Sequence, residues 1–260
     1  MKILGVKIDN LSLNEVLDKV EGFLGDNNSH YIVTPNPEFL VKAQKDEEFK
    51  KILNQADLSI PDGVGLVLAS LLSGERIKER IAGVDLMEAI CERAAEKNWP
   101  VFLFGAGEGV AEKAGDNLKG KYEGLEVKVY RPCLGVIPAK AGIQTYTFSN
   151  SWIPNQVGDD TGVGDDTLSS SILFVALGAP KQEKWINENL KKMPSVKLAI
   201  GVGGAFDFIS GNVKRAPKFI RDLGLEWLWR LMIQPWRIKR IFNAVVVFPL
   251  LVLKSKLMYN

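Results

Sequence analysis

The stretch Ser59-Ile60-Pro61-Asp62-Gly63-Val64-Gly65 decides the fold, because an apolar run ends there in a sharp turn. Proline presets its own φ and glycine admits conformations closed to other residues, so these neighbours hold the Asp62 carboxylate between a strand over 56–60 and a helix over 64–72. In α/β proteins, ligands bind at such strand ends. The local sequence is equally consistent with an aspartate that caps the following helix.

Strands alternate with helices on both sides of this turn. The predicted strands span 1–8, 31–34, 56–60, 101–104, 125–130, 172–177 and 196–202. The predicted helices span 14–24, 38–54, 64–72, 110–118, a segment capped by Asp85 that runs to about Lys97, and a segment that ends at Leu190. This order predicts an α/β, Rossmann-like fold with a largely parallel sheet and helices on both faces.

The chain divides into an α/β domain over 1–213 and a C-terminal appendage over 214–260. The appendage holds ten Lys or Arg and two Asp or Glu, so it carries +8 while the chain as a whole carries +2. A basic amphipathic helix is predicted over 225–242, bent near Pro235, and an apolar run over 241–253 follows it. That run is too short to cross a bilayer, so it is expected to lie in the membrane interface or to pack on the body.

Tryptophans interleaved with the basic residues indicate the partner of the appendage. Trp227, Trp229 and Trp236 lie among Arg230, Arg237 and Arg240, and these arginines share one helix face if Pro235 only kinks the helix. This pattern suits an anionic lipid surface better than nucleic acid. A solvated basic face is the simpler alternative.

Residues 133–171 break the pattern of strands and helices. They contain the near-repeat Val157-Gly-Asp-Asp-Thr and Val163-Gly-Asp-Asp-Thr, and we predict a low-complexity insertion. The pairs Asp159-Asp160 and Asp165-Asp166 suit a hard cation, but nothing in such a segment fixes ligand geometry. We therefore predict no metal.

Composition excludes several other classes. Cys91 and Cys133 form no CxxC pair, which favours free thiols in a reducing compartment, and the first ten residues lack the apolar core of a signal peptide. His30 is the single histidine, so a Ser-His-Asp triad and a histidine-rich metal site are improbable, and we expect it at a strand edge.

Polar residues at three strand ends form the candidate site: Thr34 with Asn36, Asp62, and Gln182. The glycine-rich turn with Gly105 and Gly107 is either a phosphate loop or a tight strand–helix contact. The hypothesis that the protein is an NAD-dependent dehydrogenase is supported by that turn alone. Gly203, after the strand over 196–202, joins Gly105 and Gly107 as a predicted nucleotide contact.

Several ordered motifs together resemble the WecG/TagA/CpsF glycosyltransferases. They are Thr34-Pro-Asn36, Pro61-Asp62-Gly63, Arg80-Ile-Ala-Gly83-Val-Asp85-Leu-Met87, Phe174-Val-Ala-Leu-Gly178-Ala-Pro-Lys-Gln182-Glu183-Lys-Trp185, Gly201-Val-Gly-Gly-Ala-Phe206-Asp207, and the tail from Arg215-Ala-Pro217 through Gly224-Leu-Glu-Trp227 to Arg240. The similarity covers nearly all of the chain outside 133–171.

The resemblance implies an inverting transfer of N-acetylmannosamine, or a related sugar, from a UDP-sugar to undecaprenyl-diphosphate-linked N-acetylglucosamine. This step belongs to the synthesis of cell-surface polymers such as teichoic acids, at the cytoplasmic face of the membrane. It implies Asp62 as general base, Thr34, Asn36, Arg80 and Gln182 around the sugar and diphosphate, and the tail arginines completing the site.

Simple chemistry agrees with these implied roles. A hydroxyl nucleophile needs a base, and arginine binds diphosphate in a bidentate manner, so no metal cofactor is required. The predicted partners are the UDP-sugar, the lipid-linked acceptor and the membrane surface, with a homo-oligomer as a further option. The alternative is a membrane-associated nucleotide-binding scaffold or sensor in which Asp62 is only a cap.

Overall fold

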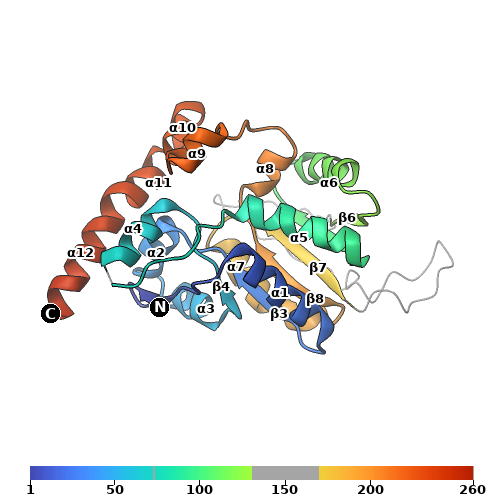
Figure 1. Ribbon diagram of the computed structural model, residues 1–260, viewed down its shortest axis with the longest axis horizontal. Helices are drawn as coiled ribbons and strands as arrows, with labels where there is room; N and C mark the ends of the chain where they lie inside the picture. Colours follow the sequence, from blue (N-terminus) through green and yellow to red (C-terminus); the bar gives the residue numbers. More distant parts are fainter. Residues whose placement is uncertain (73, 131–169, 260) are drawn as a thin grey trace, which may run out of the picture.

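A computed structural model describes residues 1–72, 74–130 and 170–259. Its centre is a six-stranded sheet in the order β4-β3-β8-β7-β5-β6, and every neighbouring pair is parallel (Figure 1). The strands are β3 (His30–Val33), β4 (Leu58–Ser59), β5 (Val101–Gly105), β6 (Val127–Tyr130), β7 (Ser171–Ala176) and β8 (Val196–Gly201). The predicted α/β class with a parallel sheet is confirmed.

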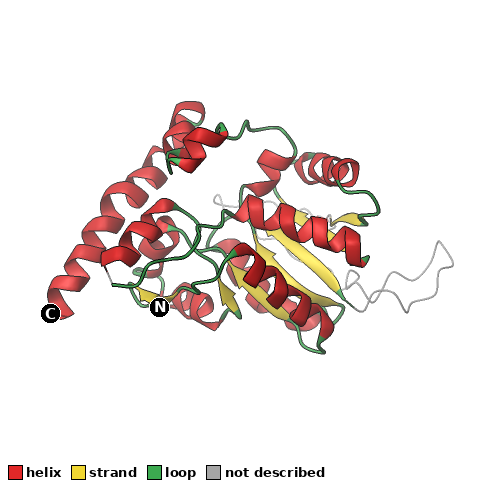
Figure 2. Cartoon of the chain, in the orientation of Figure 1, coloured by secondary structure: helices red, strands yellow, loops and turns green. Residues whose placement is uncertain are grey.

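Helices cover both faces of this sheet (Figure 2). The helices before the tail are α1 (Leu13–Gly25), α2 (Pro37–Ala43), α3 (Glu47–Gln55), α4 (Val64–Leu72), α5 (Gly83–Lys97), α6 (Val110–Lys121), α7 (Lys181–Asn189) and α8 (Ala205–Ile209). Side chains alternate along the strands: Leu103 and Phe174 pack with α1, α5 and α6, whereas Phe104 and Val175 pack with α7 on the opposite face. Burial on both faces explains why the strands read as continuous apolar runs.

Three local predictions were wrong. The helix expected over 38–54 is two helices, because Asp46 caps α3 by accepting a hydrogen bond from Phe49 N at 2.9 Å. Asp85 does not cap α5, which begins at Gly83, and it pairs instead with Arg215 at 2.7 Å. Residues 1–8 form an antiparallel hairpin of β1 (Lys2–Ile3) and β2 (Val6–Lys7) instead of one strand.

The tail is a chain of short helices that docks beside α2 and α4 (Figure 1). It comprises α9 (Lys218–Asp222), α10 (Glu226–Ile233), η3 (Pro235–Arg237), α11 (Ile238–Phe242), the π-helical η4 (Asn243–Val247) and α12 (Phe248–Tyr259). The break at Pro235 is confirmed. Phe248 and Val252 are buried with Leu40 and Leu66, so part of the apolar run packs on the body.

Within the described ranges, no helix combines the length and apolar character that crossing a bilayer requires. Cys91 is a buried free thiol, whereas Cys133 lies outside the described residues, as do most of the predicted insertion and its aspartate pairs. Membrane association of 214–260 stays a prediction.

His30 begins β3, at the strand end remote from Asp62, and is expected to make stability depend on pH. Its Nδ1 lies 2.9 Å from Asp57 and its Nε2 lies 2.9 Å from Asp26. Burial lowers the pKa of this imidazole, but the two carboxylates outweigh burial and raise it overall. The added stability is therefore complete below the unfolded pKa of about 6.5 and lost as pH rises through the folded value.

His30→Gln is expected to remove that part of the pH dependence of the unfolding midpoint in urea. Asp26→Asn is the companion variant, because it removes one of the two carboxylates that contact the imidazole, and it should weaken the same dependence. An unchanged pH profile in both variants would contradict the role of His30.

Candidate active site

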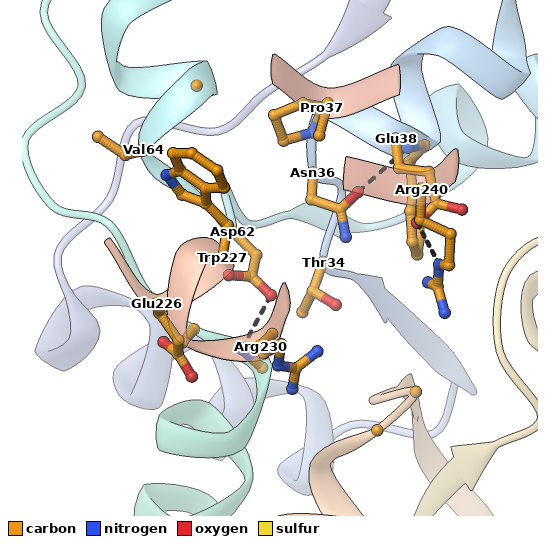
Figure 3. Close-up of a pocket in the computed structure, with 18 of the residues that line it drawn as sticks. Thr34, Asn36, Pro37, Glu38, Asp62, Val64, Glu226, Trp227, Arg230 and Arg240 are labelled. Carbon is orange, nitrogen blue, oxygen red and sulfur yellow. Dashed lines mark hydrogen bonds and ion pairs between the residues drawn. The ribbon is translucent and has the colours of Figure 1, made fainter. Parts of the chain in front are cut away.

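The carboxyl ends of four strands meet the tail around one cavity of about 480 Å³ (Figure 3). The predicted residues that line it are Thr34 and Asn36 after β3, Asp62 after β4, Gln182 after β7, Gly203 after β8, Arg80, and Arg230, Arg237 and Arg240 from the tail. Parallel strands place their carboxyl ends at one edge of the sheet, which is why residues so distant in sequence converge.

Asp62 lines this cavity directly after β4 and is half-buried. Its backbone N donates to Pro35 O at 2.9 Å, which ties the turn after β4 to the turn after β3. Gly63 has φ +108°, a conformation that favours glycine. The carboxylate accepts a weak hydrogen bond from Gly83 N at 3.4 Å, so it faces the first residue of α5 and not the helix that follows it in sequence.

The surroundings of Asp62 suit a general base. Burial raises the pKa of its carboxyl to about 6, and the negative charge of Glu226 adds to this, while the Gly83 N–H, Arg80 and Arg230 oppose it. The carboxylate is therefore ionised at neutral pH yet more basic than an ordinary aspartate. Such a pKa near the working pH is what proton abstraction requires.

Thr34 and Asn36 hold the site together and also face the cavity. The Thr34 hydroxyl donates to Gly201 O at 3.1 Å, linking β3 to β8. The Asn36 side-chain oxygen accepts from Phe39 N at 3.1 Å and caps α2, which leaves its amide NH₂ for a ligand. Gly83 lies between Thr34 and Asp62, because a Cβ there would stand 3.6 Å from the threonine hydroxyl and 3.9 Å from the carboxylate.

Gln182 joins two turns of the cavity wall. Its side-chain oxygen accepts from Gly178 N at 3.0 Å and from Gly203 N at 3.1 Å, and its NH₂ donates to Glu183 at 2.7 Å. Glu183 is fully buried, and burial raises the pKa of its carboxyl to about 7. Gly201 makes room for the pair, since a Cβ there would stand 2.6 Å from the Gln182 amide nitrogen. Gln182 is thus a structural crosslink within the cavity wall.

Arg230 and Arg237 provide the positive charge of the cavity. Both guanidinium groups approach the turn before α8, where a Cβ on Gly204 would lie 3.9 Å from one and 4.0 Å from the other. Arg230 also stacks on Phe208 at 4.3 Å. Burial together with the charges of Arg230 and Arg240 lowers the pKa of Arg237 to about 10. Among the described residues, neither arginine forms an ion pair with a carboxylate, so both are available to an anion.

Arg240 is paired with Glu38, a residue that no local sequence pattern marks as part of the site. The distance from Arg240 Nε to the buried Glu38 carboxylate is 2.7 Å, and Lys42 Nζ reaches its other oxygen at 2.9 Å. Figure 3 shows this pair across the cavity from Asp62. Glu38 lies in the first turn of α2, where a carboxylate interacts favourably with the helix dipole. This local role gives no reason to expect a contact with the tail.

Glu38→Gln is expected to loosen the docked tail by about 1–3 kcal/mol, because it leaves two cations without their carboxylate. Amide hydrogen exchange over 238–257 should become faster. Glu47→Gln is the matched control, since that exposed glutamate pairs with Lys50 at 3.8 Å and does not touch the tail. Equal exchange in both variants would show that the ion pair does not hold the tail.

The glycine-rich turn after β5 does not reach the cavity. Neither Gly105 nor Gly107 lines it, in contrast to Gly203. Gly105 has φ +99°, and a Cβ there would stand 2.9 Å from Ala176 O, so close packing of β5 against β7 accounts for this glycine. No group of three or more potential metal ligands occurs within the described residues.

Known proteins resemble this chain over most of its length. The model of the glycosyl transferase WecG/TagA/CpsF family matches residues 1–144 and 166–260, which leaves out 145–165, inside the segment that we predict as an insertion. Three similar proteins are named N-acetylglucosaminyldiphosphoundecaprenol N-acetyl-beta-D-mannosaminyltransferase. The Bacillus spizizenii protein is 34% identical over 85% of this chain and 78% of its own length.

The Bacillus subtilis protein is 31% identical over 95% of this chain and 88% of its own length, and a Staphylococcus aureus protein is 30% identical over 98% and 92%. The matched segments contain every element that builds the cavity. This chain therefore belongs to the WecG/TagA/CpsF family of glycosyltransferases.

Proposed function

We propose that this glycosyltransferase moves N-acetylmannosamine from its UDP derivative to N-acetylglucosamine on undecaprenyl diphosphate, with inversion at the anomeric carbon. The names of the relatives at 30–34% identity support the donor and the acceptor. The observation that carries the proposal is the meeting of a half-buried Asp62 with Arg80, Arg230 and Arg237 in one cavity. A sugar diphosphate and a hydroxyl nucleophile need that combination.

The proposed reaction uses these positions. Asp62 takes the proton of the acceptor hydroxyl while the hydroxyl oxygen bonds to the anomeric carbon of the donor. The bond from that carbon to the UDP oxygen breaks, and UDP leaves with the electron pair. Arg80, Arg230 and Arg237 stabilise the negative charge that develops on the diphosphate. One displacement with one base inverts the configuration.

Arginines in place of a metal ion are part of the proposal. The guanidinium groups of Arg80, Arg230 and Arg237 supply the charge that Mg²⁺ supplies in other sugar-nucleotide sites, and planar guanidinium suits diphosphate oxygens. The enzyme is expected to keep its full rate in EDTA. Activity that disappears in EDTA and returns with Mg²⁺ would overturn this part while leaving the transferase assignment intact.

The cytoplasmic face of the membrane is the proposed place of the reaction. Large apolar side chains are exposed along the tail, namely Phe219, Leu223, Met232, Trp236, Ile238, Phe242, Leu250 and Leu257. Lysines at 218, 239, 254 and 256 accompany them. Exposed apolar residues with interspersed lysines favour association with an anionic bilayer surface.

The decisive test is product formation from UDP-N-acetylmannosamine and lipid-diphosphate-linked N-acetylglucosamine. We expect a β-linked disaccharide on the lipid and release of UDP only when the acceptor is present. UDP-N-acetylglucosamine is the matched donor control and should react far more slowly. A folded protein that binds UDP but transfers no sugar from a panel of donors would favour the scaffold or sensor, and reduction of NAD by the protein would favour the dehydrogenase.

A further inference from the structure

The cavity has two chemically different ends. The polar part of its lining holds Asp62 and the arginines. The apolar end is formed between α4 and the tail and is lined by Val64, Leu68, Trp227, Ile241, Val245 and Pro249. Val64 and Trp227 lie on the same side of the cavity as Asp62, across from Arg240 (Figure 3).

Both walls change from polar to apolar in the same direction. Along the tail, the lining residues are Arg237, Arg240, Ile241, Ala244, Val245 and Pro249, a spacing that keeps them on one helical face. On the facing wall, Asp62 is followed by Val64 and, one turn later, by Leu68. The two gradients coincide because α4 packs against α12.

The apolar end opens to the surface. Leu68 is 58% exposed and Val245 is 41% exposed, although both line the cavity. Leu71 and Leu72 continue the exposed apolar surface along α4. An apolar channel that joins a cationic pocket to an exposed apolar face matches an amphiphile with an anionic head and a long hydrocarbon chain.

We propose that this end of the cavity is a groove for the first isoprene units of the acceptor's polyprenyl chain. The enzyme then recognises the lipid directly, in addition to the sugar and the diphosphate, and the chain leaves between α4 and η4 toward the membrane. The groove rests on the proposed function, which supplies the polyprenyl acceptor. A polyprenyl chain is the proposed occupant because the groove is continuous with the part of the cavity that holds the arginines.

Binding of farnesyl diphosphate and of monoethyl diphosphate, measured by calorimetry without vesicles or detergent, tests the groove independently of sugar transfer. The full-length wild type should bind the farnesyl compound at least roughly tenfold more tightly, since apolar surface is buried only by the longer chain. Leu68→Asn should lose most of that preference. Leu71→Asn is the matched control, because Leu71 is 54% exposed on the same helix but does not line the cavity, and it should retain the preference.

Equal affinities of the wild type for the two diphosphates would overturn the groove. The bilayer or a second copy of the chain would then be the partner that covers these apolar residues. An undiminished preference in Leu68→Asn would overturn it as well. Chain-dependent binding in a protein that transfers no sugar would instead sustain the groove and refute the proposed function.

Discussion

Asp62→Asn is expected to abolish sugar transfer and to stabilise the fold. Loss of the base should lower kcat by about 10²–10⁴-fold, because a general base contributes that much. The same change removes a carboxylate whose burial raises its pKa to about 6. A carboxyl with a raised pKa costs stability above its folded pKa and nothing below its unfolded one, so the variant should gain up to about 3 kcal/mol at neutral pH and little near pH 4.

Urea unfolding across this pH range, together with initial rates of UDP release, measures both effects. Asp18→Asn, at an exposed position of α1 that does not line the cavity, is the control for a general effect of removing a carboxylate, and it should leave the rate unchanged. A variant that retains transfer, or that loses stability at neutral pH, contradicts the role of Asp62 as a base with a raised pKa.

Arg237→Gln is expected to lower kcat by about 10²–10³-fold, the loss seen when one group that stabilises developing charge is removed. Arg237 is the tail arginine whose pKa is lowered most clearly, to about 10, because it is buried beside Arg230 and Arg240. Because its charged form is disfavoured in the free protein, this guanidinium group is stabilised strongly by the negative charge of an incoming diphosphate. Arg237→Lys should recover only part of the rate, since an ammonium group does not make the bidentate contact.

Lys239→Gln is the control for this series. Lys239 is a cation in the same stretch of the tail but does not line the cavity. Its removal should leave solution rates unchanged and weaken only binding to anionic vesicles. Comparable losses in the two glutamine variants would show that the tail acts through its total charge and not through Arg237.

Much of the fold followed from local pattern, and the failures have physical causes. Buried parallel strands such as β5 and β7 are continuous apolar runs, so they were readily predicted. The break at Asp46 was missed because apolar spacing continues through it from Phe39 to Leu53. Asp85 looked like a cap because an aspartate before an apolar helix usually is one, but its partner Arg215 is distant in sequence.

The site residues that follow directly after a strand were predictable from the sequence. Thr34, Asp62 and Gln182 each follow a strand, and a parallel sheet brings such ends together. Contacts between the tail and the body were not predictable in this way. The bond from Arg240 to Glu38 joins residues about 200 positions apart, and neither local sequence contains a signal for the other.

The most direct test of the central claim is the pH dependence of kcat/KM for sugar transfer between about pH 5 and pH 9. We predict an ascending limb with an apparent pKa near 6, because the ionised Asp62 is the base and its folded pKa is raised to about 6. The residual rate of Asp62→Asn should show no such limb. The same limb in Asp62→Asn, or a wild-type rate that is flat across this range, would contradict the assignment of Asp62 as the catalytic base.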